Sequence, residues 1–97
     1  MLTGKQRSYL RSLANTIQPI FQVGKGGINE NMIKQFDDAL KARELIKATV
    51  LKNSITDTRD ICEEIAGQTG AEIVQVIGSK FVLYRESKDE KVIVLPK

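Results

Sequence analysis

The order of helical and extended patterns along these 97 residues constrains the fold most strongly. Three stretches space their apolar residues three and four positions apart, as an amphipathic helix does, and the stretches between them have the short apolar or alternating patterns of strands. The expected order is helix, strand, helix, strand, helix, strand, strand. Strand–helix–strand crossovers pair strands in parallel, whereas a hairpin pairs them antiparallel. The sequence therefore predicts an α/β fold in which three helices cover a small mixed sheet of four strands.

Caps, turns and chain breakers set the boundaries of these elements. Thr3 and Gln6 have the spacing of a capping box that begins the first helix, and Pro19 stops this helix, which is expected to end near position 16. Asn29 is placed to cap the second helix, which runs to about position 43, and Gly70 is placed to end the third in the left-handed conformation. The other expected elements are strands over Ile20–Val23 and 46–50, a helix over Asp57–Thr69, strands over Ala71–Ile77 and Lys80–Arg85 joined by Gly78-Ser79, and an edge strand over Val92–Leu95.

The composition suits one soluble domain and removes several classes of function. A hydrophobic content of 41% is enough for a single core, so residues 1–97 are expected to form one domain. There is no histidine and Cys62 is the only cysteine, which excludes an intrachain disulfide and leaves a zinc site without ligands. No segment has the length of a membrane span, and the N-terminus lacks the apolar core of a signal peptide. We therefore expect a cytoplasmic monomer with no cofactor, no metal and no membrane contact.

Positive charge is concentrated in the first half of the chain. Residues 1–52 hold nine Lys or Arg against four Asp or Glu, whereas residues 53–97 hold six against eight. No acidic residue precedes Glu30, and Arg7 and Arg11 lie one turn apart on the first helix, with Lys5 at the far edge of its polar face. This pattern indicates either an anion-binding surface or a solvated face that keeps the protein soluble. Lys41, in contrast, follows Asp37 by four positions, as a helix-surface pair does.

A glycine-rich link, Gly24-Lys25-Gly26-Gly27, lies between the expected first strand and second helix. Glycine lets the backbone come close to a ligand, the first N–H groups of a helix attract anions, and Lys25 adds a full charge. The full Walker A and dinucleotide-binding patterns are missing, so nucleotide hydrolysis is not expected. What remains is G-x-x-G, the pattern with which KH-type modules clamp a nucleic-acid backbone. By itself, the link is equally compatible with a tight turn that needs glycine.

Other residues give weaker signals. Arg85, at the end of the last long strand, is placed either to contact a ligand or to protect a sheet edge. Tyr9 and Tyr84 are the only tyrosines, and neither belongs to a recognisable stacking platform, so base stacking is not expected to dominate. No general base or nucleophile stands near the glycine link. We therefore expect neither an enzyme nor a small-molecule substrate.

Four blocks of sequence occur in order along nearly the whole chain: 2–14 (LTGKQRSYLRSLA), 23–27 (VGKGG), 44–47 (ELIK) and 78–85 (GSKFVLYR). Together they resemble the CRM domain, the chloroplast RNA splicing and ribosome maturation domain, and in particular its single-domain bacterial members, the YhbY-like proteins. The resemblance implies a fold similar to the C-terminal domain of translation initiation factor three and association with precursors of the large ribosomal subunit. Group II intron splicing, the role of the multi-domain plant members, is not expected of a chain with one copy.

The sequence thus predicts a non-enzymatic protein that binds ribosomal RNA and assists assembly of the large subunit. The alternative is an adaptor whose basic surface meets an acidic protein partner. The glycine link and the basic first helix are expected to lie close together as two halves of one site. The predicted RNA-binding residues are Lys5, Arg7, Arg11, Gly24, Lys25, Gly26, Gly27 and Arg85.

Overall fold

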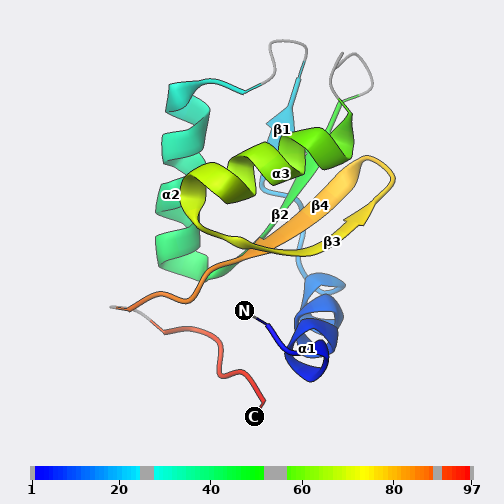
Figure 1. Ribbon diagram of the computed structural model, residues 1–97, viewed down its shortest axis with the longest axis vertical. Helices are drawn as coiled ribbons and strands as arrows, with labels where there is room; N and C mark the ends of the chain where they lie inside the picture. Colours follow the sequence, from blue (N-terminus) through cyan, green and yellow to red (C-terminus); the bar gives the residue numbers. More distant parts are fainter. Residues whose placement is uncertain (1, 25–27, 52–56, 89–90, 97) are drawn as a thin grey trace.

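The computed structural model confirms the α/β fold with three helices and a four-stranded mixed sheet. It describes residues 2–24, 28–51, 57–88 and 91–96. In chain order the elements are α1 (Gly4–Ala14), β1 (Phe21–Val23), α2 (Glu30–Arg43), β2 (Leu45–Val50), α3 (Thr58–Thr69), β3 (Glu72–Ile77) and β4 (Lys80–Tyr84), as Figure 1 shows.

The strand order is β1-β2-β4-β3, which differs from the expected arrangement at the second crossover. β1 and β2 pair in parallel, as predicted. β2 and β3, however, do not pair with each other, because β4 lies between them and is antiparallel to both. β4 is buried at four of its five positions, so its apolar side chains suit the centre of the sheet better than an edge. This order leaves β1 and β3 as the edge strands.

Alternate residues of the strands face two hydrophobic clusters on opposite sides of the sheet. α2 and α3 cover one face and α1 packs against part of the other. The larger cluster consists of Val23, Phe36, Leu40, Ile46, Ala48, Val50, Ile61, Cys62, Ile65, Ala66, Phe81 and Leu83. The smaller cluster consists of Leu10, Ala14, Leu45, Val74, Val82 and Tyr84. α1 covers only part of its face, and the C-terminal segment packs against another part of the same cluster.

The predicted caps are present. Thr3 and Gln6 form the capping box, with each side chain accepting the other residue's backbone N–H at 3.1 and 3.0 Å. The Asn29 carboxamide oxygen accepts the N–H of Met32 at 2.8 Å, and Gly70 ends α3 with φ of 73°. α1 ends at residue 14, two residues before the expected position.

The chain after β4 forms no strand over Val92–Leu95, so the prediction of an edge strand there is wrong. Glu44 explains the difference. Its buried carboxylate accepts backbone N–H groups from Ser87, Val92 and Ile93 at 2.7, 2.6 and 2.7 Å, which occupies donors that a sheet ladder would use. This segment also covers the smaller cluster, against which Ile93 and Leu95 pack. Glu44 therefore acts as the anchor of the C-terminal segment.

Candidate nucleic-acid interface

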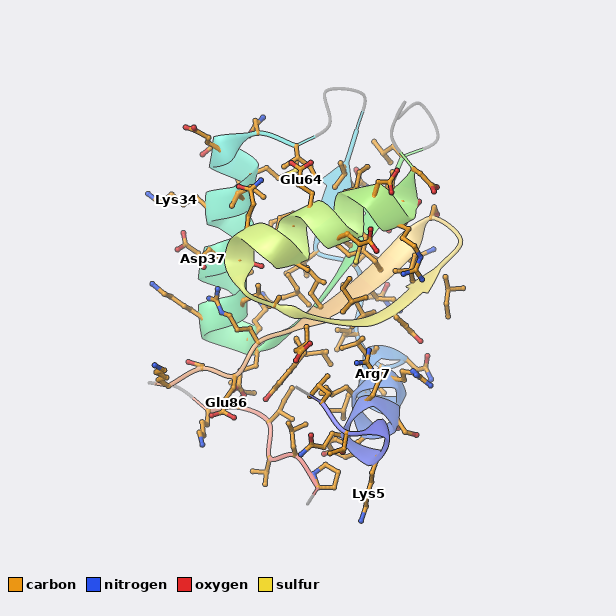
Figure 2. All side chains as sticks on the ribbon, in the orientation of Figure 1. Lys5, Arg7, Lys34, Asp37, Glu64 and Glu86 are labelled. Carbon is orange, nitrogen blue, oxygen red and sulfur yellow. The ribbon has the colours of Figure 1, made fainter. Side chains whose placement is uncertain are left out.

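α1 presents its basic residues in two different directions. Leu10 and Ala14 are fully buried against the sheet, and Arg7 and Arg11 lie along one flank of this buried stripe. Figure 2 shows Arg7 directed toward the sheet, whereas Lys5 points away from it at the outer end of the helix. The structure therefore separates Lys5 from the two arginines with which the sequence grouped it.

A groove runs beside β3 and is lined by arginines from two helices. Arg7 and Arg11 come from α1 and Arg59 from the first turn of α3, with residues 73–76 of β3 forming the remaining wall. We call this groove the edge groove. The Arg7 guanidinium donates a hydrogen bond to the carbonyl oxygen of Ile73, which fixes its position. Among the described residues that line the groove there is no carboxylate.

Arg59 lines the edge groove but is not among the residues that the sequence predicted for the site. It stands on a helix rich in acidic residues and is far along the chain from Arg11, so no local pattern groups the two. One signal was available: Arg59 is the second residue of α3, where a cation is opposed by the positive end of the helix dipole. The dipole of α3 does not stabilise an arginine at this position, which indicates a role for Arg59 outside helix stability.

An irregularity in β3 shapes the edge groove. Opposite the consecutive residues Leu83 and Val82, β3 places Ile73 and Gln75, so one extra residue is inserted between them. That residue, Val74, turns into the smaller cluster under α1. A bulge of this kind disturbs the ladder of an edge strand, and the bond from Arg7 occupies one of its free carbonyl groups. The edge of β3 is therefore poorly suited to pair with another strand.

A second depression lies on the part of the sheet that α1 leaves uncovered. It is lined by Asn15 at the end of α1, by Lys47 and Val82 on the central strands, and by Gln75 and Lys80 near the β3–β4 hairpin. We call it the sheet cleft. The Lys47 ammonium donates to the carbonyl oxygen of Ala14 at 3.2 Å and so ties α1 to β2. Gln75 lines both the edge groove and the sheet cleft, which makes them neighbours.

Only Gly24 of the glycine link lies within the described residues; Lys25, Gly26 and Gly27 lie outside them. The φ angle of Gly24 is outside the left-handed region. A Cβ atom added to Gly24 would lie 3.5 Å from Leu51 Cδ1, which is an ordinary contact. Neither the backbone nor the packing requires glycine at this position, so the tight-turn explanation does not hold for Gly24.

The expected closeness of the glycine link and α1 is wrong for the described part of the link. Figure 1 shows the end of β1, where Gly24 lies, at one end of the long axis and α1 toward the other. The cause is the direction of β1, which starts near α1 and runs away from it. Gln22, Thr49 and Lys80 are aligned across the uncovered sheet face between these two ends. This sheet face therefore lies between α1 and Gly24 of the glycine link, the two parts of the predicted site.

Arg85 has structural partners. Its guanidinium donates to the Asp37 carboxylate at 2.6 Å, to the Thr69 carbonyl oxygen at 2.7 Å and to the Asp37 carbonyl oxygen at 3.0 Å. The hydrogen bond from Arg85 holds the pKa of Asp37 below its usual value, and the charge of Lys41 contributes less. The ion pair of Asp37 is thus with Arg85, not the expected one with Lys41. RNA binding by Arg85 stays a prediction, which this geometry does not favour.

Replacement of Arg85 by glutamine is expected to lower the free energy of unfolding by about 2 kcal/mol, because it removes charge-assisted hydrogen bonds that join β4 to α2 and α3. Urea denaturation measures this change. Lys41→Gln is the control, and we expect it to alter stability by less than ~0.5 kcal/mol. If Arg85→Gln leaves stability intact and weakens RNA binding, Arg85 belongs to the interface after all.

Cys62 is buried in the larger cluster. Burial raises the pKa of the Cys62 thiol to about 12, so it is protonated and unreactive at neutral pH. No group of three or more potential metal ligands occurs among the described residues, and no helix among them is long and apolar enough to cross a membrane.

A family model, that of the CRS1 / YhbY (CRM) domain, matches residues 2–85. The chain belongs to the CRM domain family. The match extends from α1 to the end of β4, so the CRM domain of this chain contains the edge groove, the sheet cleft and the glycine link.

Relatives of this CRM domain protein have names that refer to RNA. It is 55% identical over 96 residues to the Bacillus subtilis protein named "Probable RNA-binding protein YqeI", covering 99% of this chain and 100% of the relative. It is 34% identical over 91 residues to a Haemophilus influenzae protein named "RNA-binding protein", covering 94% and 92%. The solution structure of SAV1595 from Staphylococcus aureus, described as a candidate RNA-binding protein, has a TM-score of 0.81 and 62% identity and covers 99% and 100% of the two chains.

Proposed function

We propose that this protein binds RNA through the sugar-phosphate backbone and assists assembly of the large ribosomal subunit in the cytoplasm, without catalysing a reaction. The observation that carries RNA binding is the edge groove, in which Arg7, Arg11 and Arg59 converge from two helices and no described lining residue is acidic. Neither Arg11 nor Arg59 forms an ion pair with another described residue. Their charge is therefore available to an external anion.

The chemistry of the arginine side chain suits phosphate. Its planar guanidinium presents several N–H donors in a fixed fork that matches two phosphate oxygens. Arg7 uses a donor on the Ile73 carbonyl and keeps its remaining N–H groups for a ligand, already oriented. We propose that Lys25 and the backbone of Gly24, Gly26 and Gly27 bind a second stretch of the same RNA. Such contacts supply affinity and position but carry no base sequence.

The ribosomal part of the proposal rests on the family. The resemblance to the YhbY-like proteins implies association with precursors of the large subunit, while the relatives named above are described only as RNA-binding proteins. Crosslinking of RNA to the protein in growing cells, followed by sequencing, tests this part. We expect enrichment of large-subunit ribosomal RNA and its precursors. Recovery of diffuse cellular RNA without that enrichment would contradict the assembly role and leave RNA binding intact.

Gly24→Ala distinguishes a ligand contact from a folding requirement. Because an added methyl group fits beside Leu51, we expect the free energy of unfolding to change by less than ~1 kcal/mol. RNA affinity should fall about tenfold if the RNA backbone approaches Gly24, which corresponds to about 1.4 kcal/mol. Fluorescence anisotropy with labelled RNA measures the affinity.

Gly67→Ala is the matched control. Gly67 lies exposed on α3 with nothing within 4 Å of an added Cβ, so this change should not weaken RNA binding. Equal RNA affinities for Gly24→Ala and the parent protein would show that RNA does not approach Gly24. A loss of stability well above ~1 kcal/mol would restore the tight-turn explanation.

A further inference from the structure

The edge groove and the sheet cleft adjoin at Gln75, which lines both, and together they form one extended surface. We call this surface the backbone track. It begins between α1 and α3 at Arg11 and Arg59, passes Gln75, and ends at Lys80 beside the hairpin. Asn15 and Gln75 add amide groups, which can both donate and accept hydrogen bonds. The track therefore offers cations for phosphates and amides for hydroxyl groups.

The described lining residues of the track include no carboxylate. The acidic residues next to lining residues in sequence, Asp60 beside Arg59 and Glu72 beside Ile73, do not line the edge groove. Lys80 is exposed. A polyanion lying in the track would thus meet cations from α1, α3 and β4 without facing a negative side chain.

The track also has no aromatic side chain, although all five aromatic residues of the protein are described. Phe36, Phe81 and Tyr84 are buried, and the Phe21 ring packs on that of Phe36 with centroids 4.3 Å apart. Tyr9 is 40% exposed, but it lies on the opposite flank of α1 from Arg7 and Arg11, roughly half a helical turn away from both. Proteins that bind unpaired nucleotides usually stack the bases on aromatic rings. The track lacks this means of holding a single strand.

We propose that the backbone track binds the sugar-phosphate backbone of double-helical RNA, with Arg59 and Lys80 among its contacts. In an RNA helix the bases already stack on one another, and phosphates and 2′-hydroxyl groups are what a protein can reach. Cations and amides without aromatic rings match these groups. The inference rests on the proposed function and specifies which form of RNA the surface takes.

The test compares two RNAs of equal length and composition at one salt concentration. One is a hairpin with a stem of about 16 base pairs, the span that known double-stranded RNA modules contact, and the other cannot pair with itself. We expect the hairpin to bind about tenfold more tightly. If the unpaired strand binds equally or more tightly, the inference is wrong and the proposed function stands. If neither RNA binds, the proposed function fails as well.

Single substitutions test whether the preference for the hairpin depends on residues of the backbone track. Arg59→Gln and Lys80→Gln are each expected to weaken hairpin binding about fivefold and to reduce the slope of log affinity against log salt by about one. Lys34→Gln removes the same charge from α2, away from the track, and should leave both quantities nearly unchanged (Figure 2). Thermal unfolding confirms that each variant folds. Losses no larger than that of Lys34→Gln would overturn the assignment of Arg59 and Lys80.

Tyr9→Leu tests the competing mode of binding, in which unpaired bases stack on the ring of Tyr9. Because the track makes no use of an aromatic ring, this variant should bind the hairpin and the unpaired strand as the parent protein does. A selective loss of affinity for the unpaired strand, together with a parent preference for that strand, would show that stacking on Tyr9 holds the RNA.

Discussion

Replacement of Glu44 by alanine is expected to lower the free energy of unfolding by about 3 kcal/mol, the largest effect of any single change to an acidic residue here. The Glu44 side chain is fully buried, and its carboxylate accepts three backbone N–H groups at 2.6 to 2.7 Å. Alanine would leave these donors without an acceptor and release the segment that covers the smaller cluster. For a domain of this size the melting temperature should fall by about 15 °C. Thermal and urea unfolding measure the change.

Glu44→Gly distinguishes the contribution of the Glu44 carboxylate to stability from that of its backbone conformation. Glu44 has φ of 64°, a conformation that glycine adopts more easily than other residues. Glycine relieves that strain but supplies no acceptor, so we expect it to be destabilising, though less than alanine by about 1 kcal/mol. A glycine variant as stable as the parent protein would show that the three hydrogen bonds contribute little.

The same carboxylate makes stability depend on pH. Burial raises the pKa of Glu44, but the hydrogen bonds from Ser87, Ile93 and Val92 and the charge of Lys91 outweigh it, so the pKa in the folded protein lies below its usual value. A folded pKa below the unfolded value of about 4.3 means that the contribution is complete above that pH and is lost as the pH falls through the folded pKa. Glu44→Gln should therefore lose less stability than the parent protein on acidification. Equal losses of stability in Glu44→Gln and the parent protein on acidification would contradict the lowered pKa of Glu44.

The Lys25→Asp, Gly26→Asp double variant is expected to lose about 100-fold in RNA affinity at fixed salt, or about 2.8 kcal/mol. It removes one positive charge and adds two negative charges where we propose that phosphates lie, so attraction becomes repulsion. Stability should be nearly unchanged, which circular dichroism and urea unfolding check.

The matched control is Lys34→Asp with Gly67→Asp, which has the same residue changes and the same change in net charge. Both positions are exposed, on α2 and α3 respectively. We expect this control to lose less than about fivefold, through the general field of the protein alone. Equal losses in the two double variants would show that the glycine link is not a specific contact.

The sequence predicted most of the fold because its elements are defined by local signals. The capping box at Thr3 and Gln6, the N-cap at Asn29 and the left-handed Gly70 each act over a few residues, and all three appear where expected. The position of β4 between β2 and β3 was not predictable in this way, because it depends on which strand best fills the centre of the sheet. The strand expected over 92–95 failed because a distant carboxylate, that of Glu44, takes its N–H groups.

The candidate site was predictable only in part, because contacts between distant parts of the chain also decide which of its residues lie together. The charge on α1 was visible, but Lys5 and Arg7 point in different directions and Arg59 joins the groove through the fold alone. Arg85 was grouped with the basic residues because its partners, Asp37 and Thr69, are distant in sequence. Sequence patterns report charge; the fold determines which charges face the same ligand and which are already neutralised.

The salt dependence of RNA affinity tests the central claim most directly. For four to six phosphate contacts with a double helix, log affinity should fall linearly with log salt concentration, with a slope between about −3.5 and −5.5. Anisotropy titrations of the parent protein with an RNA hairpin at several potassium chloride concentrations give this slope. A steep slope in that range is the predicted result. No measurable RNA binding at low salt, or binding with a slope near zero, would contradict the account and favour an adaptor that meets an acidic protein.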